Sequence, residues 1–431
     1  MAMDGKELVE KLAKLSQVQS IKDIPHLTHA LFPGTHCPLM GAAMAVGGIK
    51  DSLIVVVGTD ECTYYTKSMT IHSEKFGGID GRCVSVVLDD HDVTFGSAEK
   101  VQEAFKEIIE EYRPQCVFLV TTCVIEIIGD DFDAISEGLS KLYGIPVLPV
   151  HTEHFKCEDH LPGLERTITV CAEMMKSCDC DNSVNLLGQR MGDFATTELY
   201  AMLQKAGVKI GLQLPCGCSV DDIKNAAAAK VNIVVNDIAL PLAQKMQEKF
   251  GIPYVYFNKF VIPEKIYEAY KNLFGYLELE LPEELEGLYQ NAREEIEKNK
   301  GELEGITYIY GNTPYAVFEM NCFLSSLGMV PQVIQTNRYT EADEPYAKEI
   351  LQYTDPYVCK AANIAPLQYV YDVLSPYLYL GHEFGNRLRQ KGIAIVHSDR
   401  ASGMLGFEVT GYLLQQLVKS VREAKEYRKE L

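Results

Sequence analysis

The sequence of 431 residues lacks several features that mark particular classes of protein. No segment approaches the roughly 18 consecutive apolar residues of a membrane span. The charged N-terminus has neither the apolar core nor the cleavage site of a signal peptide. A phosphate loop (Gly-x-x-x-x-Gly-Lys-Ser/Thr) is missing, so nucleotide hydrolysis is not expected. The net charge of −20 argues against a nucleic-acid-binding surface, and the absence of tryptophan excludes nothing. We expect a cytoplasmic protein that binds neither membrane nor nucleic acid.

Cysteine, by contrast, is abundant, with 13 residues. In a reducing cytoplasm these are not expected to form a disulfide framework, so metal binding or simple burial must explain them. Cys37 precedes Pro38 at the start of a predicted helix. Cys62 and Cys123 each follow an apolar run that is typical of a buried parallel strand.

These three cysteines are predicted to converge on one site. Ligands gather at the carboxyl ends of the strands in open α/β sheets, so two strand-end thiols and one helix-start thiol can meet there. The positive end of a helix also favours thiolate, the form of cysteine that binds metals. We predict that Cys37, Cys62 and Cys123 are ligands of an iron–sulfur cluster.

The rest of the chain repeats one pattern, in which an apolar strand is followed by a turn and an amphipathic helix. This alternation predicts an α/β fold of three Rossmann-like domains with parallel sheets and right-handed crossovers. Residues 1–28 are expected to form an N-terminal helical extension, and residues 29–180 a first domain that carries the three cysteines. Residues 181–300 are expected to form a second domain that ends in a charged connector helix, and residues 301–431 a third domain.

A second site is suggested by polar residues at other strand ends. Cys216 and Cys218 follow a predicted strand at residues 208–214, and a Cys-x-Cys pair can present both sulfurs to one metal or cluster. The alternatives are loop cysteines without a ligand or a small redox pair. His397 ends a predicted strand of the third domain, where it is either a cofactor ligand or a hydrogen-bonded histidine.

Three motifs resemble the cluster-cysteine segments of the nitrogenase component 1 family. They are residues 37–42 (CPLMGA), 58–62 (GTDEC) and 121–131 (TTCVIEIIGDD). The intervals of 25 residues from Cys37 to Cys62 and 61 from Cys62 to Cys123 also suit that family. The family includes nitrogenase molybdenum-iron protein subunits, cofactor-assembly scaffolds and relatives in dark-operative protochlorophyllide reductase.

The resemblance implies three Rossmann-like domains around a central cleft, with a P-cluster-like or [4Fe–4S] cluster shared at the interface between two subunits. It implies a homodimer, or a heterotetramer with a paralogous subunit. A separate ATP-dependent iron–sulfur reductase, similar to the nitrogenase iron protein, would supply low-potential electrons. A second iron–sulfur cofactor is a further expectation, with Cys216, Cys218 and His397 as its candidate ligands.

One departure from the family limits the function that we expect. Nitrogenase holds a further cofactor through a Cys of the second domain and a His of the third. His397 matches the His, but the Cys position falls near residues 235–236, where this sequence has none. We therefore expect a nitrogenase-like reductase subunit with an unidentified substrate, and we do not expect it to reduce dinitrogen. The alternatives are a scaffold for maturation of a complex iron–sulfur cofactor and a redox protein without a substrate.

A run of histidines and one cysteine follows the last predicted strand of the first domain. His151, His154, Cys157 and His160 recur every three residues, which is a spacing that can support a zinc site. The segment of the family that this run resembles is a loop lining the cleft between domains, without a metal of its own. A polar cleft wall is therefore the preferred interpretation.

Overall fold

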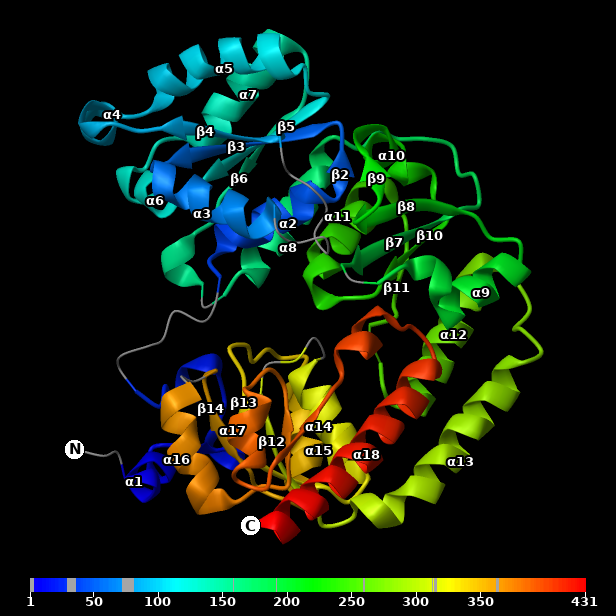
Figure 1. Ribbon diagram of the computed structural model, residues 1–431. Coiled ribbons are helices and arrows are strands. Elements are labelled where there is room, and N and C mark those ends of the chain that lie inside the picture. The colour runs from blue at the N-terminus through cyan, green and yellow to red at the C-terminus, as the bar shows by residue number, and fades with distance from the viewer. Residues whose placement is uncertain are drawn as a thin grey trace.

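Three sheets, parallel except for one edge strand and each covered by helices, follow one another along the chain (Figure 1). This arrangement confirms the predicted α/β fold with Rossmann-like domains. In the part of the chain that is described, no helix is both long and apolar enough to cross a membrane. The computed structural model describes residues 4–28, 36–71, 81–157, 159–190, 192–258, 260–311, 313, 316–361 and 364–431, without the side chains of 69–71 and 364–365.

The first sheet is wholly parallel, with the strand order β4-β3-β5-β6. Its strands are β3 (Ser52–Gly58), β4 (Cys83–Val87), β5 (Cys116–Thr121) and β6 (Val147–Val150). Every residue of β3 and β5 is buried, which explains their continuous apolar sequences. Successive residues of a strand point to opposite faces, so one face packs against α5 (Ala98–Tyr112) and α7 (Phe132–Tyr143). The other face packs against α2 (Pro38–Gly47) and α8 (Leu161–Val170).

The helices α2 and α8 approach each other unusually closely, because glycines remove the side chains between them. A Cβ atom on Gly41 would lie 1.9 Å from the carbonyl oxygen of His160. A Cβ atom on Gly163 would lie 1.8 Å from the carbonyl oxygen of Pro38. Any larger residue would force the backbones apart. This contact places the start of α2 beside the start of α8.

The second sheet is also parallel, with the order β11-β10-β7-β8. Its strands are β7 (Val184–Gln189), β8 (Ile210–Pro215), β10 (Val231–Val234) and β11 (Tyr254–Tyr256). Its helices are α9 (Glu198–Lys205), α10 (Val220–Lys224), α11 (Leu240–Phe250) and α12 (Pro263–Leu277). A short ladder between β2 (Ile49–Lys50) and β9 (Cys218–Ser219) joins the first two units, and one apolar core runs through both.

The third sheet has six strands in the order β1-β14-β13-β12-β15-β16. All its pairs are parallel except β1 with β14, so the N-terminal segment supplies an edge strand as well as a helix. Its strands are β1 (Ala13–Lys14), β12 (Thr307–Tyr310), β13 (Val330–Gln335), β14 (Tyr357–Cys359), β15 (Leu378–Leu380) and β16 (Ala394–Val396). Its helices include α1 (Gly5–Glu10), α14 (Val317–Ser326), α15 (Glu344–Tyr353), α16 (Ile364–Leu374) and α17 (Gly385–Arg389).

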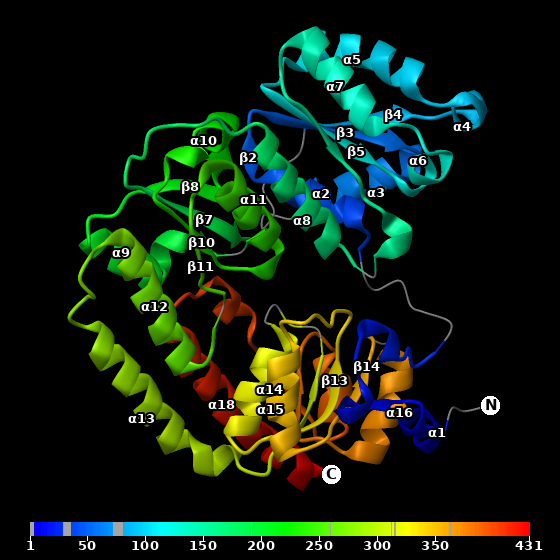
Figure 2. The same cartoon turned by 180° about the vertical axis from the view of Figure 1, so that it is seen from behind.

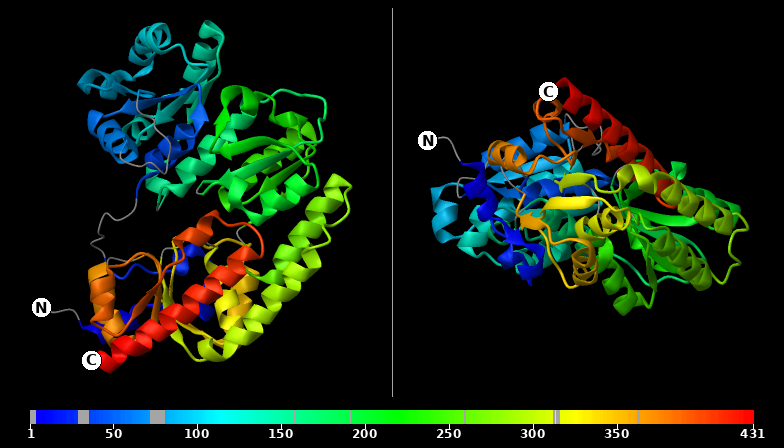
Figure 3. Two further views of the ribbon diagram at one scale, coloured as in Figure 1. Left: turned by 45° about the vertical axis from the view of Figure 1, so that its right-hand side comes forward. Right: turned by 90° about the horizontal axis from the view of Figure 1, so that it is seen from below.

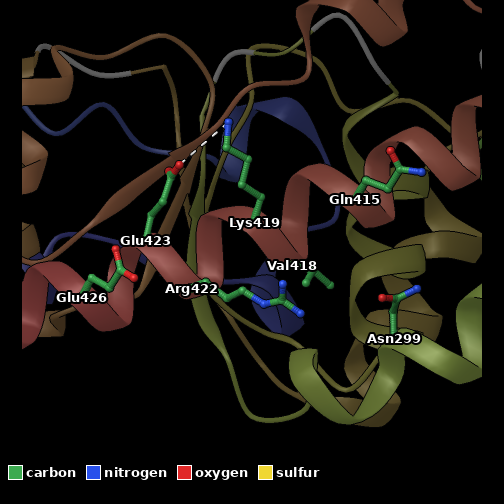
Figure 4. Close-up of a pocket in the computed structure, with 7 residues that line it drawn as sticks. All are labelled: Asn299, Gln415, Val418, Lys419, Arg422, Glu423 and Glu426. Atoms are coloured by element: carbon green, nitrogen blue, oxygen red, sulfur yellow. Dashed lines mark ion pairs between the residues drawn. The ribbon is translucent and has the colours of Figure 1, made fainter.

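The charged connector is helix α13 (Leu285–Leu303), and it lies alongside the C-terminal helix α18 (Glu408–Glu430) on the outside of the molecule (Figures 2 and 3). Leu285, Ala292 and Leu303 are buried, so one face of the connector is packed although the rest is solvated. A groove of about 350 Å³ between the two helices is lined mainly by charged and amide side chains (Figure 4). The groove lies between α13 and α18, whereas the first unit lies at the other end of the molecule (Figure 1).

A buried carboxyl group in the third unit leads to a prediction about pH. Glu319 of α14 is 4% exposed and its Oε1 atom has no hydrogen-bond partner. Burial raises the pKa of Glu319 from 4.5 to about 7, and the positive charge of Lys265 opposes this only partly. A raised folded-state pKa gives stability that is present below pH 4.5 and is lost as the pH rises through 7.

Glu319→Gln is therefore expected to remove this dependence. The difference in unfolding free energy, variant minus native chain, should increase by on the order of 3 kcal/mol between pH 4.5 and pH 8. Urea titrations at several pH values measure this difference. Glu344→Gln changes a partly exposed carboxylate that pairs with Lys348 at 3.2 Å, and it serves as the control. Parallel pH curves for the native chain and Glu319→Gln would contradict the prediction.

Candidate iron–sulfur site

The structure brings Cys37, Cys62 and Cys123 to the same edge of the first sheet. Strands β3 and β5 are parallel neighbours, with Val57 opposite Thr121, so their carboxyl ends coincide. Each cysteine also begins a helix. Cys37 is the N-cap of α2, Cys62 lies in the first turn of α3 (Asp60–Ile71), and Cys123 is the first residue of α6 (Cys123–Ile128). Three helix N-termini thus supply positive potential where the thiols lie.

The electrostatic environment of Cys123 indicates how close the thiols are. Each of the three cysteines is half-buried. Burial raises the pKa of Cys123, and negative charge on Cys62 and on Cys37 raises it further. Hydrogen bonds from backbone N–H groups lower it. Cys37 and Cys62 therefore both lie within electrostatic reach of Cys123, and all three thiols are partly shielded from solvent.

The spacing of the thiols is wider than one metal ion needs. Among the described residues, only Asp89, His91 and Asp92 have three ligand atoms that all lie within 4.8 Å of one another. Wider spacing suits a multinuclear iron–sulfur cluster, in which each cysteine binds a different iron. The Asp89 group itself is a helix cap whose carboxylates pair with Lys100, at 3.0 Å from Asp89 and 2.6 Å from Asp92.

Hydroxyl groups flank two of the cysteines. Thr59 Oγ1 donates to Cys62 Sγ at 3.5 Å. Thr122, next to Cys123, has a buried Oγ1 with no hydrogen-bond partner in the described chain. A Cβ atom on Gly58 would lie 2.1 Å from that oxygen, so the absence of a side chain at Gly58 lets the ends of β3 and β5 close together. These features suit a site for a sulfur-rich group.

Glu126 supports the segment that carries Cys123, a role that the sequence suggests but cannot decide. Its Oε1 accepts hydrogen bonds from Thr121 Oγ1 at 2.5 Å and from the backbone N–H of Glu153 at 3.3 Å. The backbone N–H of Thr152 in turn donates to Thr121 Oγ1 at 3.0 Å. This network fixes α6 to the loop that follows β6 and so fixes the position of Cys123.

Exposed apolar side chains surround the edge that carries the cysteines. They lie on α3, α4 (Asp90–Phe95) and α6, which cluster at one end of the first unit (Figures 1 and 2). Monomeric soluble proteins rarely expose such a group together, because water contact with it is unfavourable. We call this group the apolar rim, and it consists of Tyr64 (65% exposed), Tyr65 (68%), Val93 (46%), Phe95 (76%) and Ile127 (71%).

The two cysteines of the second predicted site have different surroundings. Cys218 on β9 is 1% exposed, packs in the core shared by the first two units, and has a pKa raised to about 12 by burial. Cys216 is half-buried, and its Sγ donates to the carbonyl oxygen of Arg190 at 3.6 Å. Burial raises the pKa of Cys216, and the guanidinium of Arg190 opposes this rise. Only Cys216 faces polar surroundings, and a role for either residue in binding a cofactor remains a prediction.

His397 is exposed at the end of β16. It lines a pocket of about 120 Å³ at the carboxyl ends of the third sheet, together with Glu383 and His382. His382 Nε2 lies 3.2 Å from Asp399 Oδ1. Within the described residues, His397 does not form a three-ligand group with Cys216 or Cys218. Its role as a cofactor ligand also remains a prediction.

The run after β6 does not form the zinc site that its spacing permits. Within the described part of the chain, its histidines and cysteine are not gathered within 4.8 Å. His151 Nε2 lies 3.2 Å from Asp133 Oδ1, and Cys157 Sγ accepts from Arg166 Nη1 at 3.7 Å. His160 is the N-cap of α8 and faces the second unit. These polar contacts agree with the interpretation of this run as a polar wall rather than a zinc site.

Comparisons with known proteins place the chain in a family. The family model for nitrogenase component 1 type oxidoreductases matches residues 37–422. The chain is 31% identical over 224 residues to the nitrogenase iron-molybdenum cofactor biosynthesis protein NifE of Clostridium pasteurianum, which covers 51% of this chain and 49% of that protein. It is 25% identical over 309 residues to the nitrogenase molybdenum-iron protein alpha chain of Methanosarcina barkeri, which covers 68% of this chain and 58% of that protein.

A solved structure shows the same fold. The structure of nitrogenase Cp1 at pH 6.5 superposes with a TM-score of 0.78 at 15% sequence identity, and covers 94% of this chain and 95% of that chain. The sequence alignments themselves span only about half of the curated relatives' length. The family match, however, begins at Cys37 and extends through nearly the whole chain. The resemblance seen in the cysteine motifs is therefore confirmed, and this protein belongs to the nitrogenase component 1 type oxidoreductase family.

Proposed function

We propose that this protein is the cluster-bearing, electron-accepting subunit of a nitrogenase-like reductase. The observation that carries the proposal is the convergence of three half-buried thiols at three helix N-termini on one sheet edge. In this proposal Cys37, Cys62 and Cys123 hold a P-cluster-like or [4Fe–4S] cluster. When bound, such a cluster supplies one-electron redox chemistry at low potential.

The surrounding residues have defined tasks in the proposal. Half-burial of the thiols keeps most water away from the site, which affects the redox potential of any cluster held there. The hydrogen bond from Thr59 to Cys62 Sγ withdraws charge from that sulfur. Glu126 keeps Cys123 in place through Thr121 and Glu153.

The apolar rim supports a second subunit over the cluster. Three cysteines leave part of a cluster without protein ligands, and the rim encloses the same sheet edge. A second subunit seated on Tyr64, Phe95 and Ile127 would bury this surface and could supply the remaining ligands. That subunit is either a second copy of this chain or a paralogue. An ATP-dependent iron–sulfur reductase would then dock on the assembly and deliver electrons.

The proposal can be tested with the anaerobically purified protein and a nitrogenase-type iron protein as the reductase. With MgATP, the reductase should bleach the visible absorption of this protein and produce an electron paramagnetic resonance signal on it. With MgADP, neither change should occur. Equal reduction with both nucleotides, or no reduction with either, would contradict the proposal.

A second candidate function is a scaffold on which a complex iron–sulfur cofactor is matured. The likeness to a cofactor biosynthesis protein favours it. A scaffold should transfer its metal to an apo-recipient within one incubation, whereas a reductase subunit should retain its iron through many reduction cycles. Measuring the iron that remains with this chain after mixing with an apo-form of nitrogenase component 1, followed by separation, distinguishes the two functions.

A further inference from the structure

Arg190 is a half-buried cation whose side chain has no ion-pair partner in the described chain. It directly follows β7, at the carboxyl end of the second sheet, where ligands of parallel sheets bind. Its Nε atom is closed to solvent and has no hydrogen-bond partner. In the described chain, no ion pair includes Arg190, although arginine presents five donors in a rigid fork.

The carboxylates nearest to Arg190 already bind other groups. Asp237 Oδ2 pairs with Arg338 Nη1 at 3.2 Å, and Asp159 Oδ1 accepts from the backbone N–H of Leu161 at 2.9 Å. Both carboxylates act on Arg190 only at longer range. Burial lowers the pKa of His160 to about 4, so this neighbour is neutral at pH 7 and leaves the positive charge to Arg190.

The closed Nε atom of Arg190 carries a cost, because it has lost its hydration and gained no hydrogen bond in exchange. Buried polar groups in native proteins are nearly always paired, so an exception requires an explanation. A missing ligand provides one. The fork of arginine matches the two oxygens of a carboxylate or a phosphate, and it binds them through two parallel hydrogen bonds.

Arg190 lies where the three units of the molecule meet. A Cβ atom on Gly192, two residues later, would lie 2.8 Å from Gly403 Cα in the third unit, so the two backbones touch. Arg338 of the third unit reaches Asp237 of the second at 3.2 Å and Glu165 of the first at 3.8 Å. Residues of all three units therefore lie near the end of β7.

The same place is close to the cysteine edge. His36 precedes Cys37, and its ring centroid lies 6.4 Å from that of His160. His160 in turn lies within electrostatic range of Arg190. The glycine contacts between α2 and α8 keep the starts of these two helices, and so Cys37 and His160, close together.

We propose that Arg190 binds an oxyanion group, a carboxylate or a phosphate, of the substrate that this subunit helps to reduce. The inference rests on the proposed function and narrows the substrate to an anionic molecule. Arg190 anchors and orients the ligand, and Cys216 and His160 line its surroundings.

Calorimetric titration of the complete anaerobic protein with succinate and with inorganic phosphate tests the inference. At least one probe should bind, and the stronger one identifies the oxyanion. Arg190→Met should weaken that binding by about tenfold or more. Arg190→Lys should retain part of it, because the charge remains but the fork is lost. Arg400→Met removes an exposed arginine near Tyr412 and should leave binding unchanged.

Thermal unfolding without a probe provides a second measurement. Because Arg190 has no partner, Arg190→Met should unfold at the same temperature as the native chain or higher. A large drop would show that Arg190 is a structural cation and would overturn the inference. So would absence of binding by either probe, or equal binding by Arg190→Met and the native chain. Loss of oxyanion binding in Arg190→Met should leave the visible spectrum intact, so failure of the cluster proposal is seen separately, in that spectrum.

Discussion

Replacement of Cys62 or Cys123 by alanine is expected to remove nearly all iron and visible absorption from the anaerobically purified protein without unfolding it. Both thiols are only half-buried and begin helices at the sheet edge, so their removal leaves the strands intact. A cluster that loses one thiolate ligand also loses the negative charge that balances its iron. Iron and sulfide analysis, with electron paramagnetic resonance, measures the loss, and circular dichroism checks the fold.

Cys116→Ala is the matched control for these variants. Cys116 lies on β5, the strand that leads to Cys123, but it is 0% exposed and packs in the core. Its removal should lower the unfolding temperature, because it creates a small cavity that costs on the order of 1 kcal/mol. The iron content should be unchanged. Native iron content in Cys62→Ala and Cys123→Ala would exclude these residues as ligands, and iron loss in Cys116→Ala would point to an indirect effect of destabilisation.

The second large effect is expected at the apolar rim, where Ile127→Asp should convert an oligomer into a monomer of 48.2 kDa. Ile127 is 71% exposed on α6, four residues after Cys123. A carboxylate placed in a dry interface loses its hydration and finds no partner, so the dissociation constant should rise by about a hundredfold or more. Light scattering coupled to size-exclusion chromatography measures the mass of both proteins.

Leu142→Asp provides the comparison for Ile127→Asp. Leu142 is 72% exposed, but it lies at the C-terminal end of α7, away from the cysteine edge. This variant should keep the mass of the native protein. A native chain that is already monomeric, with its cluster bound, would refute the assignment of the rim to a second subunit. Dissociation of both variants would show that an added charge dissociates the oligomer wherever it is placed, and it would also contradict the assignment.

The sequence was sufficient for the elements whose signal is local. The helices α5, α7 and α11 have a strong amphipathic period, and β3 and β5 are recognised by unbroken apolar runs. The helix start at Cys37 follows from the proline beside it. These patterns depend on neighbours in the sequence, so they can be found without the fold.

Other features depend on contacts between distant residues and could not be predicted. Strand β1 pairs with β14, which is more than 340 residues away along the chain, and nothing at Ala13 signals this. Arg190 is a single arginine after a strand, which in sequence is the normal sign of a surface position. The separation of Cys216 from Cys218 depends on Gly217, whose positive φ of 87° turns the chain between them.

The core that runs through the first two units has a mechanical consequence. Because β2 and β9 pair across it, these two units should move as one rigid body. The third unit has two apolar cores of its own and joins the core of the second unit through Leu405 and Phe407. Relative motion of the units is therefore expected at the boundary between the third unit and the other two. Binding of a large ligand should therefore involve a hinge motion at that boundary. The distance between the cysteine edge and the second sheet should not change during this motion.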